Sequence, residues 1–334
     1  ALYGDLSFQR PPLLAAVYGS ALKAGGALGL PYDLSLRVLA CLWSALTVAI
    51  LAYFLFTRLD GVSAAIGSLL AALGSASMTL QNEANSETWM LLPYVASGVV
   101  VAAAAEHDDE SSRTSLLMLA AGVLTGVAVL FKEVAAVNLA LPVLAWLVFD
   151  RKRLGRWARP ALAFWGGALS TVLLAVAGLA AIGDARDFFY STWITRIWYS
   201  TSSDLRAEGL PLLLRRAEQF QWALTWTMVA AVVLFVVAWI WGREDKPGWR
   251  LSVFGAAWLA VSFVGVAASG RYYPHYFIQI LPALTITVAA SLACLRGQAA
   301  EDGRWLAAGA TLLSALAVSV AAVGAVHGIQ RLPA

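Results

Sequence analysis

Long apolar segments constrain this chain more than any other feature of its sequence. A helix needs about 20 apolar residues to cross a bilayer, and a backbone in lipid must satisfy its own hydrogen bonds. The sequence therefore predicts an all-α, polytopic membrane protein of about ten transmembrane helices plus interfacial helices. The ten candidate segments are Ser35–Phe56, Val62–Leu80, Thr88–Ala105, Ser115–Phe131, Val134–Phe149, Ala161–Ile182, Phe220–Trp241, Leu251–Ser269, Tyr276–Leu295 and Trp305–Val326.

Composition excludes a soluble domain and a nucleic-acid-binding protein. Only 13% of the 334 residues are charged, against about 25% in soluble proteins. The 14 Trp and 10 Tyr residues suit the aromatic belts of a membrane–water interface. The net charge of +3 is spread out, so no basic patch points to nucleic acid. Cys41 and Cys294 lie in apolar segments without metal-ligand spacing, which indicates core thiols.

Lys and Arg are unevenly shared between the two sets of loops. The sparse set holds little beyond Arg10, Lys132 and Arg271. By the positive-inside rule the rich set is cytoplasmic, which predicts a multi-pass protein of the cell (plasma) membrane. The rich set comprises Arg58, Arg113, Arg151, Lys152, Arg153, Arg156, Arg159, Arg243, Lys246, Arg250, Arg296 and Arg304.

Polar groups of mixed chemistry converge on the opposite, outer face. We treat residues 1–334 as one transmembrane domain whose outer-face loops are 1–12, 81–87, 184–219 and 270–276. Ionisable groups at a membrane boundary are costly and are therefore functional candidates. The segment 184–219 is too long for a passive connector. Its aromatic spacing predicts an amphipathic interfacial helix, either an anchor or a wall along which an acceptor slides.

Three stretches of these outer loops resemble one enzyme family. They are Leu2-Tyr3-Gly4-Asp5 followed by Arg10-Pro11-Pro12-Leu13, then Asn85-Ser86-Glu87 with Lys132, and then Arg271-Tyr272-Tyr273-Pro274-His275-Tyr276-Phe277 through Leu281-Pro282. In this order they are similar to GT-C glycosyltransferases of the polyprenyl-phosphate-dependent family, which includes protein O-mannosyltransferases and aminoarabinose transferases. The resemblance implies transfer of a sugar from a polyprenyl phosphate to a lipid, glycan or protein acceptor on the extracytoplasmic face.

The resemblance also implies roles for individual side chains. Arg10 and Arg271, with Lys132 as a third cation, are expected to bind the donor phosphate, because guanidinium groups pair bidentately with it. Asp5 and Glu87 are expected to take the acceptor proton or to orient the acceptor. His275 is also a candidate ligand for a divalent metal, and no other cofactor is implied. The residues expected to orient the substrates are Gln9, Asn85, Tyr272, Tyr273, His275 and Tyr276.

The sequence departs from the family pattern at its beginning. Family members carry a membrane helix and an outer-face acidic residue, assigned as the catalytic acid or base, ahead of the Pro-Pro motif, and this sequence begins after that point. Gln9 and Arg10 replace a Glu-Lys pair of the aminoarabinose transferases in which the Glu helps to bind a metal. The carboxylate that helps to bind a metal at that position in those relatives is therefore replaced by an amide here.

Several other interpretations remain open from the sequence alone. Arg10 and Arg271 also suit interfacial anchors, and Lys132 can pair with its neighbour Glu133. A membrane transporter, a lipid-linked glycan polymerase or ligase, and a non-catalytic family member are the alternative functions. A transporter would place charges near the bilayer midplane, where this sequence offers only Asn138 and Gln279 as notable polar groups.

Overall fold

The computed structural model describes residues 12–82, 85–106, 112–150, 154–190, 194, 222–241, 248–268, 274–302 and 309. Within these residues the regular elements are helices, so the predicted all-α class is confirmed. In chain order they are α1 (Pro12–Ala27), α2 (Tyr32–Arg58), α3 (Gly61–Asn82), α4 (Ser86–Ala105), α5 (Ser112–Phe131), η1 (Glu133–Ala140), α6 (Leu141–Phe149), α7 (Leu154–Ala181), α8 (Ala185–Phe189), α11 (Trp222–Trp241), α12 (Trp249–Ala267), η3 (Pro274–Ile280) and α13 (Leu281–Asp302).

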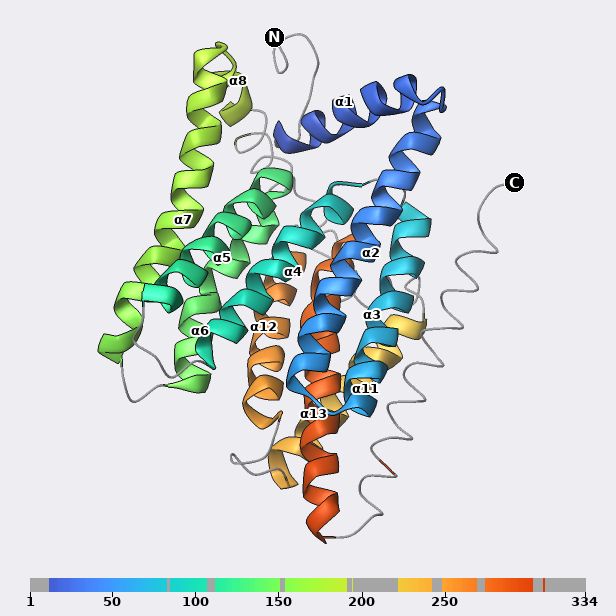
Figure 1. Ribbon diagram of the computed structural model, residues 1–334, viewed down its shortest axis with the longest axis vertical. Helices are drawn as coiled ribbons and strands as arrows, with labels where there is room; N and C mark the ends of the chain where they lie inside the picture. Colours follow the sequence, from blue (N-terminus) through green and yellow to red (C-terminus); the bar gives the residue numbers. More distant parts are fainter. Residues whose placement is uncertain are drawn as a thin grey trace, which may run out of the picture.

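Most of these helices run along one axis and form a bundle, which α1 crosses at one end (Figure 1). Six helices of the described part are long and apolar enough to span a membrane, and three shorter apolar helices accompany them. Nine of the ten predicted segments correspond to described helices. The tenth, Trp305–Val326, and the part of 184–219 after α8 lie outside the described residues, apart from Tyr190, Ile194 and Gly309.

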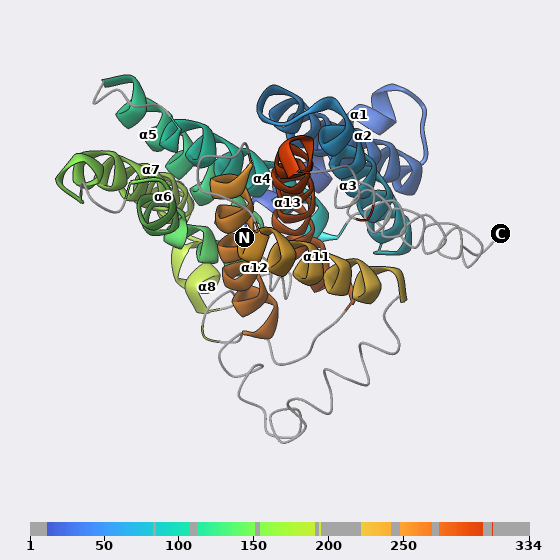
Figure 2. The same ribbon diagram turned by 90° about the horizontal axis from the view of Figure 1, so that it is seen from below.

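Helix α13 is the centre of the bundle. All of its most apolar stretch is buried, whereas only 22% of the corresponding stretch of α7 is buried. Seen along the bundle, α13 lies among α3, α11 and α12, which pack against it (Figure 2). A helix that is apolar on every side is expected to be fully covered by protein. In the first four turns of α13 the polar side chains are the small Thr285, Thr287 and Ser291, and Ser291 hydrogen-bonds Ser252 of α12 across 2.7 Å.

Glycines allow α5 and α7 to pack backbone against backbone. A Cβ added at Gly122 would clash with the Phe164 carbonyl, and one added at Gly167 would lie 2.5 Å from the Leu119 carbonyl oxygen. Small residues at such crossings let membrane helices approach closely. Helix α5 carries the chain from the charged end of the bundle to η1, so its packing against α7 helps to position the segment described below.

We expect Gly167→Ala to destabilise the protein, because the new methyl group must push the two backbones apart. The cost should be about 1–3 kcal/mol, as for other overpacked cores. The matched control is Gly166→Ala, because a Cβ added at Gly166 would meet no atom within 4 Å. Thermal unfolding in detergent measures both variants. Equal melting temperatures for the two would contradict this account of the α5–α7 contact.

Two predicted spans begin as 3₁₀ helices instead of α-helices. Val134–Phe149 consists of η1 followed by α6, and Tyr276–Leu295 begins inside η3. In each case a proline, Pro142 or Pro282, stands near the start of the following α-helix. Proline cannot donate to the carbonyl four residues earlier. The Asn138 carbonyl accepts instead from the Leu141 amide, three residues on, which favours the tighter 3₁₀ geometry.

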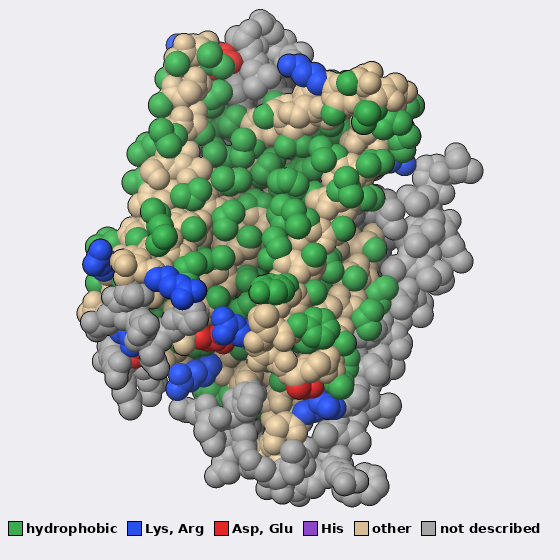
Figure 3. Space-filling model, in the orientation of Figure 1, with side chains coloured by type: hydrophobic (Ala, Val, Ile, Leu, Met, Phe, Trp, Pro, Cys, Tyr) green, Lys and Arg blue, Asp and Glu red, His purple; other side chains and the backbone are tan. Residues whose placement is uncertain are grey.

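Charged side chains pair at the end of the bundle opposite α1 (Figure 3). Arg58 pairs with Glu106 at 2.9 Å, and Arg296 of α13 pairs with Asp60 at 3.2 Å. Asp60 also caps α3, accepting hydrogen bonds from the Val62 and Ser63 amides. Burial raises the pKa of Asp60, but its hydrogen bonds with Ser63 and Val62 and the charge of Arg296 outweigh this and hold the pKa below its ordinary value.

Candidate active site

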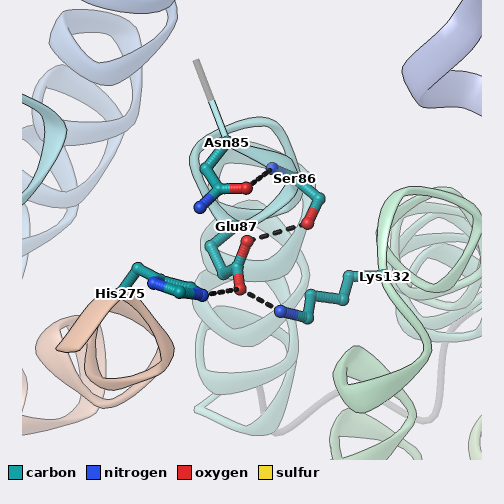
Figure 4. A network of polar contacts seen from close by, with 5 residues as sticks. All are labelled: Asn85, Ser86, Glu87, Lys132 and His275. Atoms are coloured by element: carbon teal, nitrogen blue, oxygen red, sulfur yellow. Dashed lines mark hydrogen bonds and ion pairs between the residues drawn. The ribbon is translucent and has the colours of Figure 1, made fainter. Parts of the chain in front are cut away.

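Three side chains that are far apart in the sequence meet near the end of the bundle where α1 lies. Glu87 comes from the first turn of α4, Lys132 immediately precedes η1, and His275 is the second residue of η3. Figure 4 shows the Lys132 ammonium and the His275 ring pointing at the same carboxylate. We call Glu87, Lys132 and His275 the polar triad.

The start of α4 fixes the position of Glu87. Asn85 is the N-cap, and its side-chain oxygen accepts a hydrogen bond from the Ser86 amide at 3.1 Å. The Ser86 hydroxyl donates to Glu87 Oε2 at 2.7 Å. A carboxylate in the first turn is also favoured by the helix dipole. Local contacts therefore place Glu87 in the first turn of α4 and hold one of its two carboxylate oxygens.

Lys132 stands where α5 ends and η1 begins. Its amide still bonds four residues back to the Ala128 carbonyl, while its own carbonyl accepts from Ala135, three residues on. The extended backbone between these two patterns (φ −159°, ψ 128°) turns the side chain inward. Its ammonium pairs with Glu87 Oε1 and lies 4.0 Å from the centre of the Tyr276 ring. This pairing with Glu87 accounts for the burial of Lys132.

His275 is the exposed member of the polar triad. Its Nε2 lies 3.4 Å from Glu87 Oε1, and 24% of its side chain is exposed, against 3% for Glu87 and 2% for Lys132. The Tyr276 ring stands edge-on to it, with 4.6 Å between ring centres. A molecule entering the site would therefore reach the imidazole before it reached the buried ion pair.

This geometry has clear chemical consequences. Two opposite charges out of water stabilise each other strongly, and removing either one leaves the other uncompensated. With neutral imidazole the polar triad carries no net charge, and protonation of His275 makes it positive and able to attract an anion. Among the described residues no three His, Cys, Asp or Glu side chains form a metal-binding group, so this part of the chain offers no built metal site.

Five predicted site residues are therefore placed by the structure: Glu87, Lys132, His275, Asn85 and Tyr276. Glu87 contacts both Lys132 and His275, Tyr276 covers these two side chains, and Asn85 caps the helix that carries Glu87. The other predicted site residues lie outside the described residues and stay predictions: Asp5, Gln9, Arg10, Arg271, Tyr272 and Tyr273.

Sequence reasoning missed a second polar cluster, farther along the same helices. The Trp258 indole donates to both the Tyr94 hydroxyl (3.1 Å) and Asn138 Oδ1 (2.9 Å), and Tyr94 shares a 2.6 Å hydrogen bond with Ser262. Asn138 was visible as an amide inside an apolar span. Tyr94 and Trp258 carried no signal, because aromatic residues are ordinary in membrane helices.

The family described as dolichyl-phosphate-mannose-protein mannosyltransferase matches residues 10–180, just over half of the chain. The chain belongs to that family. The matched region carries Glu87, Lys132 and the motif that begins at Arg10. The resemblance to GT-C glycosyltransferases is thereby confirmed. No curated protein matches this family member at a significant level.

Solved structures agree on the fold. The archaeal oligosaccharyltransferase AglB from Archaeoglobus fulgidus, in complex with an inhibitory peptide and a dolichol-phosphate, superposes with a TM-score of 0.54 at 13% identity, covering 97% of this chain and 48% of that one. The same enzyme tethered to an acceptor peptide with the NVT sequon gives 0.54 at 14% identity, with 96% and 47% covered. The present chain thus spans about half the length of these structures.

We expect Lys132→Met to destabilise the protein by about 3 kcal/mol or more, because it leaves the Glu87 carboxylate buried without its cation. The double variant Lys132→Met/Glu87→Gln should regain much of that stability, since the neutral amide can still accept from Ser86. Unfolding in detergent measures both. A double variant as unstable as the single one would show that the buried charge is not what stabilises this site.

Proposed function

We propose that this protein is an integral membrane glycosyltransferase that moves a hexose or pentose from a polyprenyl-phosphate donor to a lipid, glycan or protein acceptor. The observation that carries the proposal is the polar triad, built at one end of a membrane bundle by a chain that belongs to a mannosyltransferase family. The lipid tail of such a donor stays in the bilayer, so its sugar and phosphate arrive at that end of the bundle.

The reaction needs a base and a cation near the sugar. The acceptor hydroxyl oxygen forms a bond to C1, the bond from C1 to the phosphate oxygen breaks with its electron pair staying on the phosphate, and the hydroxyl proton goes to a base. Cations stabilise the departing phosphate. We assign that task to Arg10, Arg271 and Lys132, as the sequence suggests.

The contacts of Glu87 refine its role. This carboxylate is already engaged by Lys132, Ser86 and His275, so we propose that it orients the imidazole and the ammonium, and that Asp5 takes the acceptor proton. His275, with its partly exposed ring, then contacts the donor phosphate or the sugar. Tyr276 limits the movement of both neighbours by covering them.

A transporter remains the second candidate from another class, because a buried ion pair and a deeper polar cluster also occur in transport proteins. The two functions differ in their product. The enzyme releases a covalently modified acceptor, whereas a transporter moves an unchanged solute across a sealed vesicle.

For activity, we expect Glu87→Gln to lower sugar transfer about a hundredfold or more, because Lys132 and His275 lose the group that positions them. The matched control is Glu106→Gln, which changes the same chemical group at the other end of α4, where Glu106 pairs with Arg58.

The assay uses membranes that contain the protein, a set of radiolabelled polyprenyl-phosphate hexoses and pentoses, and endogenous acceptors. The control should keep the activity of the parent protein. Transfer by the Glu87→Gln variant at the parental rate would remove the polar triad from the reaction.

For orientation, we propose that the polar triad faces the outside of the plasma membrane. In a variant with Cys41 and Cys294 replaced by Ala, a cysteine at Arg10, Asn85 or Arg271 should react with an impermeant maleimide added to intact cells. A cysteine at Ser112, at the start of α5, should react only after permeabilisation. Labelling of the three outer positions from different sides of the membrane would contradict the proposal.

A further inference from the structure

A buried polar cluster links two 3₁₀ helices: η1, which directly follows Lys132, and η3, which carries His275. Its members are Tyr94 of α4, Asn138 of η1, Trp258 and Ser262 of α12, and Gln279 of η3, and each is at most 1% exposed. We call these five side chains the inner network. Buried polar groups in a membrane protein are expensive unless they are fully paired, so a cluster of five calls for a physical reason.

Asn138 ties η1 to two helices at once. Its amide nitrogen donates to the Tyr94 backbone carbonyl at 3.0 Å, and its side-chain oxygen accepts from the Trp258 indole at 2.9 Å. The first bond reaches α4, the helix that carries Glu87, and the second reaches α12. The donor and the acceptor group of one side-chain amide therefore hold η1 against the helices that flank it.

Gln279 ties η3 to the same place. Its amide nitrogen donates to the Val134 carbonyl of η1 at 3.4 Å, and its side chain also hydrogen-bonds the Tyr94 hydroxyl. Gly265 of α12 leaves the space that this amide occupies, because a Cβ at that position would collide with it. The two 3₁₀ helices are thus joined directly, through a side chain of one and the backbone of the other.

Such bonds matter more for these two segments than for an ordinary helix. A 3₁₀ helix has poorer hydrogen-bond geometry than an α-helix and is seldom longer than about four residues, whereas η1 has eight residues and η3 has seven. Their own backbones therefore hold them weakly. Contacts with neighbouring helices must supply the rigidity that an active site requires.

We propose that the inner network is a positioning device: it sets the separation of η1 and η3, and so holds Lys132 and His275 on the Glu87 carboxylate. Asn138 and Gln279 are its positioning residues. This inference rests on the proposed glycosyltransferase function for its effect on catalysis. Its structural part, the burial of Lys132, can be measured without any substrate.

Two near-isosteric variants test the network. Asn138→Leu removes both bonds of the amide but leaves the Trp258 indole with the Tyr94 hydroxyl as an acceptor, at 3.1 Å. Gln279→Met removes the link between η3 and η1 with little change of shape. The control is Ser97→Ala, which removes a buried hydrogen bond between α4 and α5 (Ser97–Thr125, 2.7 Å) one turn beyond Tyr94 and outside the inner network.

The structural measurement is acetylation of Lys132 by acetic anhydride in lipid nanodiscs, followed by mass spectrometry. Lys132 is buried and paired, whereas Lys23 of α1 is exposed and serves as an internal standard for reagent access. We expect both network variants to raise the ratio of Lys132 to Lys23 acetylation several-fold. They should also lower kcat for sugar transfer about tenfold to a hundredfold, as expected for a small displacement of reacting groups. Ser97→Ala should change neither value.

The acetylation ratio and kcat together separate the possible outcomes. An unchanged acetylation ratio in both folded network variants would overturn the proposal, and so would an equal rise in Ser97→Ala, which would indicate general loosening. A raised ratio with an unchanged kcat would overturn the link to catalysis. If the ratio rises as expected but the parent protein transfers no sugar from any donor, the positioning of Lys132 is supported and the proposed function is the part that fails.

Discussion

The ion pair between Glu87 and Lys132 is the interaction on which the site depends. A single charge in such a buried place would be prohibitively expensive, so neither residue can be where it is without the other. The pair joins α4 to the junction of α5 and η1, which lie 45 residues apart in the sequence. It thereby fixes the start of α4 against the end of α5 and leaves the partly exposed His275 as the group that faces an incoming molecule.

Proline explains much of the irregular structure around this pair. Pro93 inside α4 cannot donate to the Trp89 carbonyl, and the Trp43 indole of α2 donates to that carbonyl instead, at 3.0 Å. Pro142 and Pro282 likewise favour the 3₁₀ helices that precede α6 and α13. Inside a membrane, each backbone carbonyl that loses its helical hydrogen bond needs another donor, and a polar side chain can supply it. The irregular backbone and the polar side chains thus occur together for one physical reason.

The family match and the fold match cover different parts of the site. The match over residues 10–180 establishes the family and includes two members of the polar triad. The third, His275, lies beyond the matched region and is brought to the site by the packing of η3 against α3, α4 and α12. The oligosaccharyltransferase structures cover nearly the whole chain at 13% and 14% identity, which indicates that one helical framework accommodates very different side chains.

The sequence by itself determined the class of the protein, the position of nine described helical segments and the candidate status of Glu87, Lys132 and His275, because hydrophobic length and charge placement are local properties of a chain. Only the tertiary structure decided which of these side chains contact one another. Lys132 has an acidic neighbour in Glu133, yet the structure pairs it with Glu87, because the extended backbone at Lys132 turns its side chain inward. The sequence singled out Asn138 and Gln279 of the inner network but not their partners, because Tyr94 and Trp258 lie on helices that meet only when the bundle is folded.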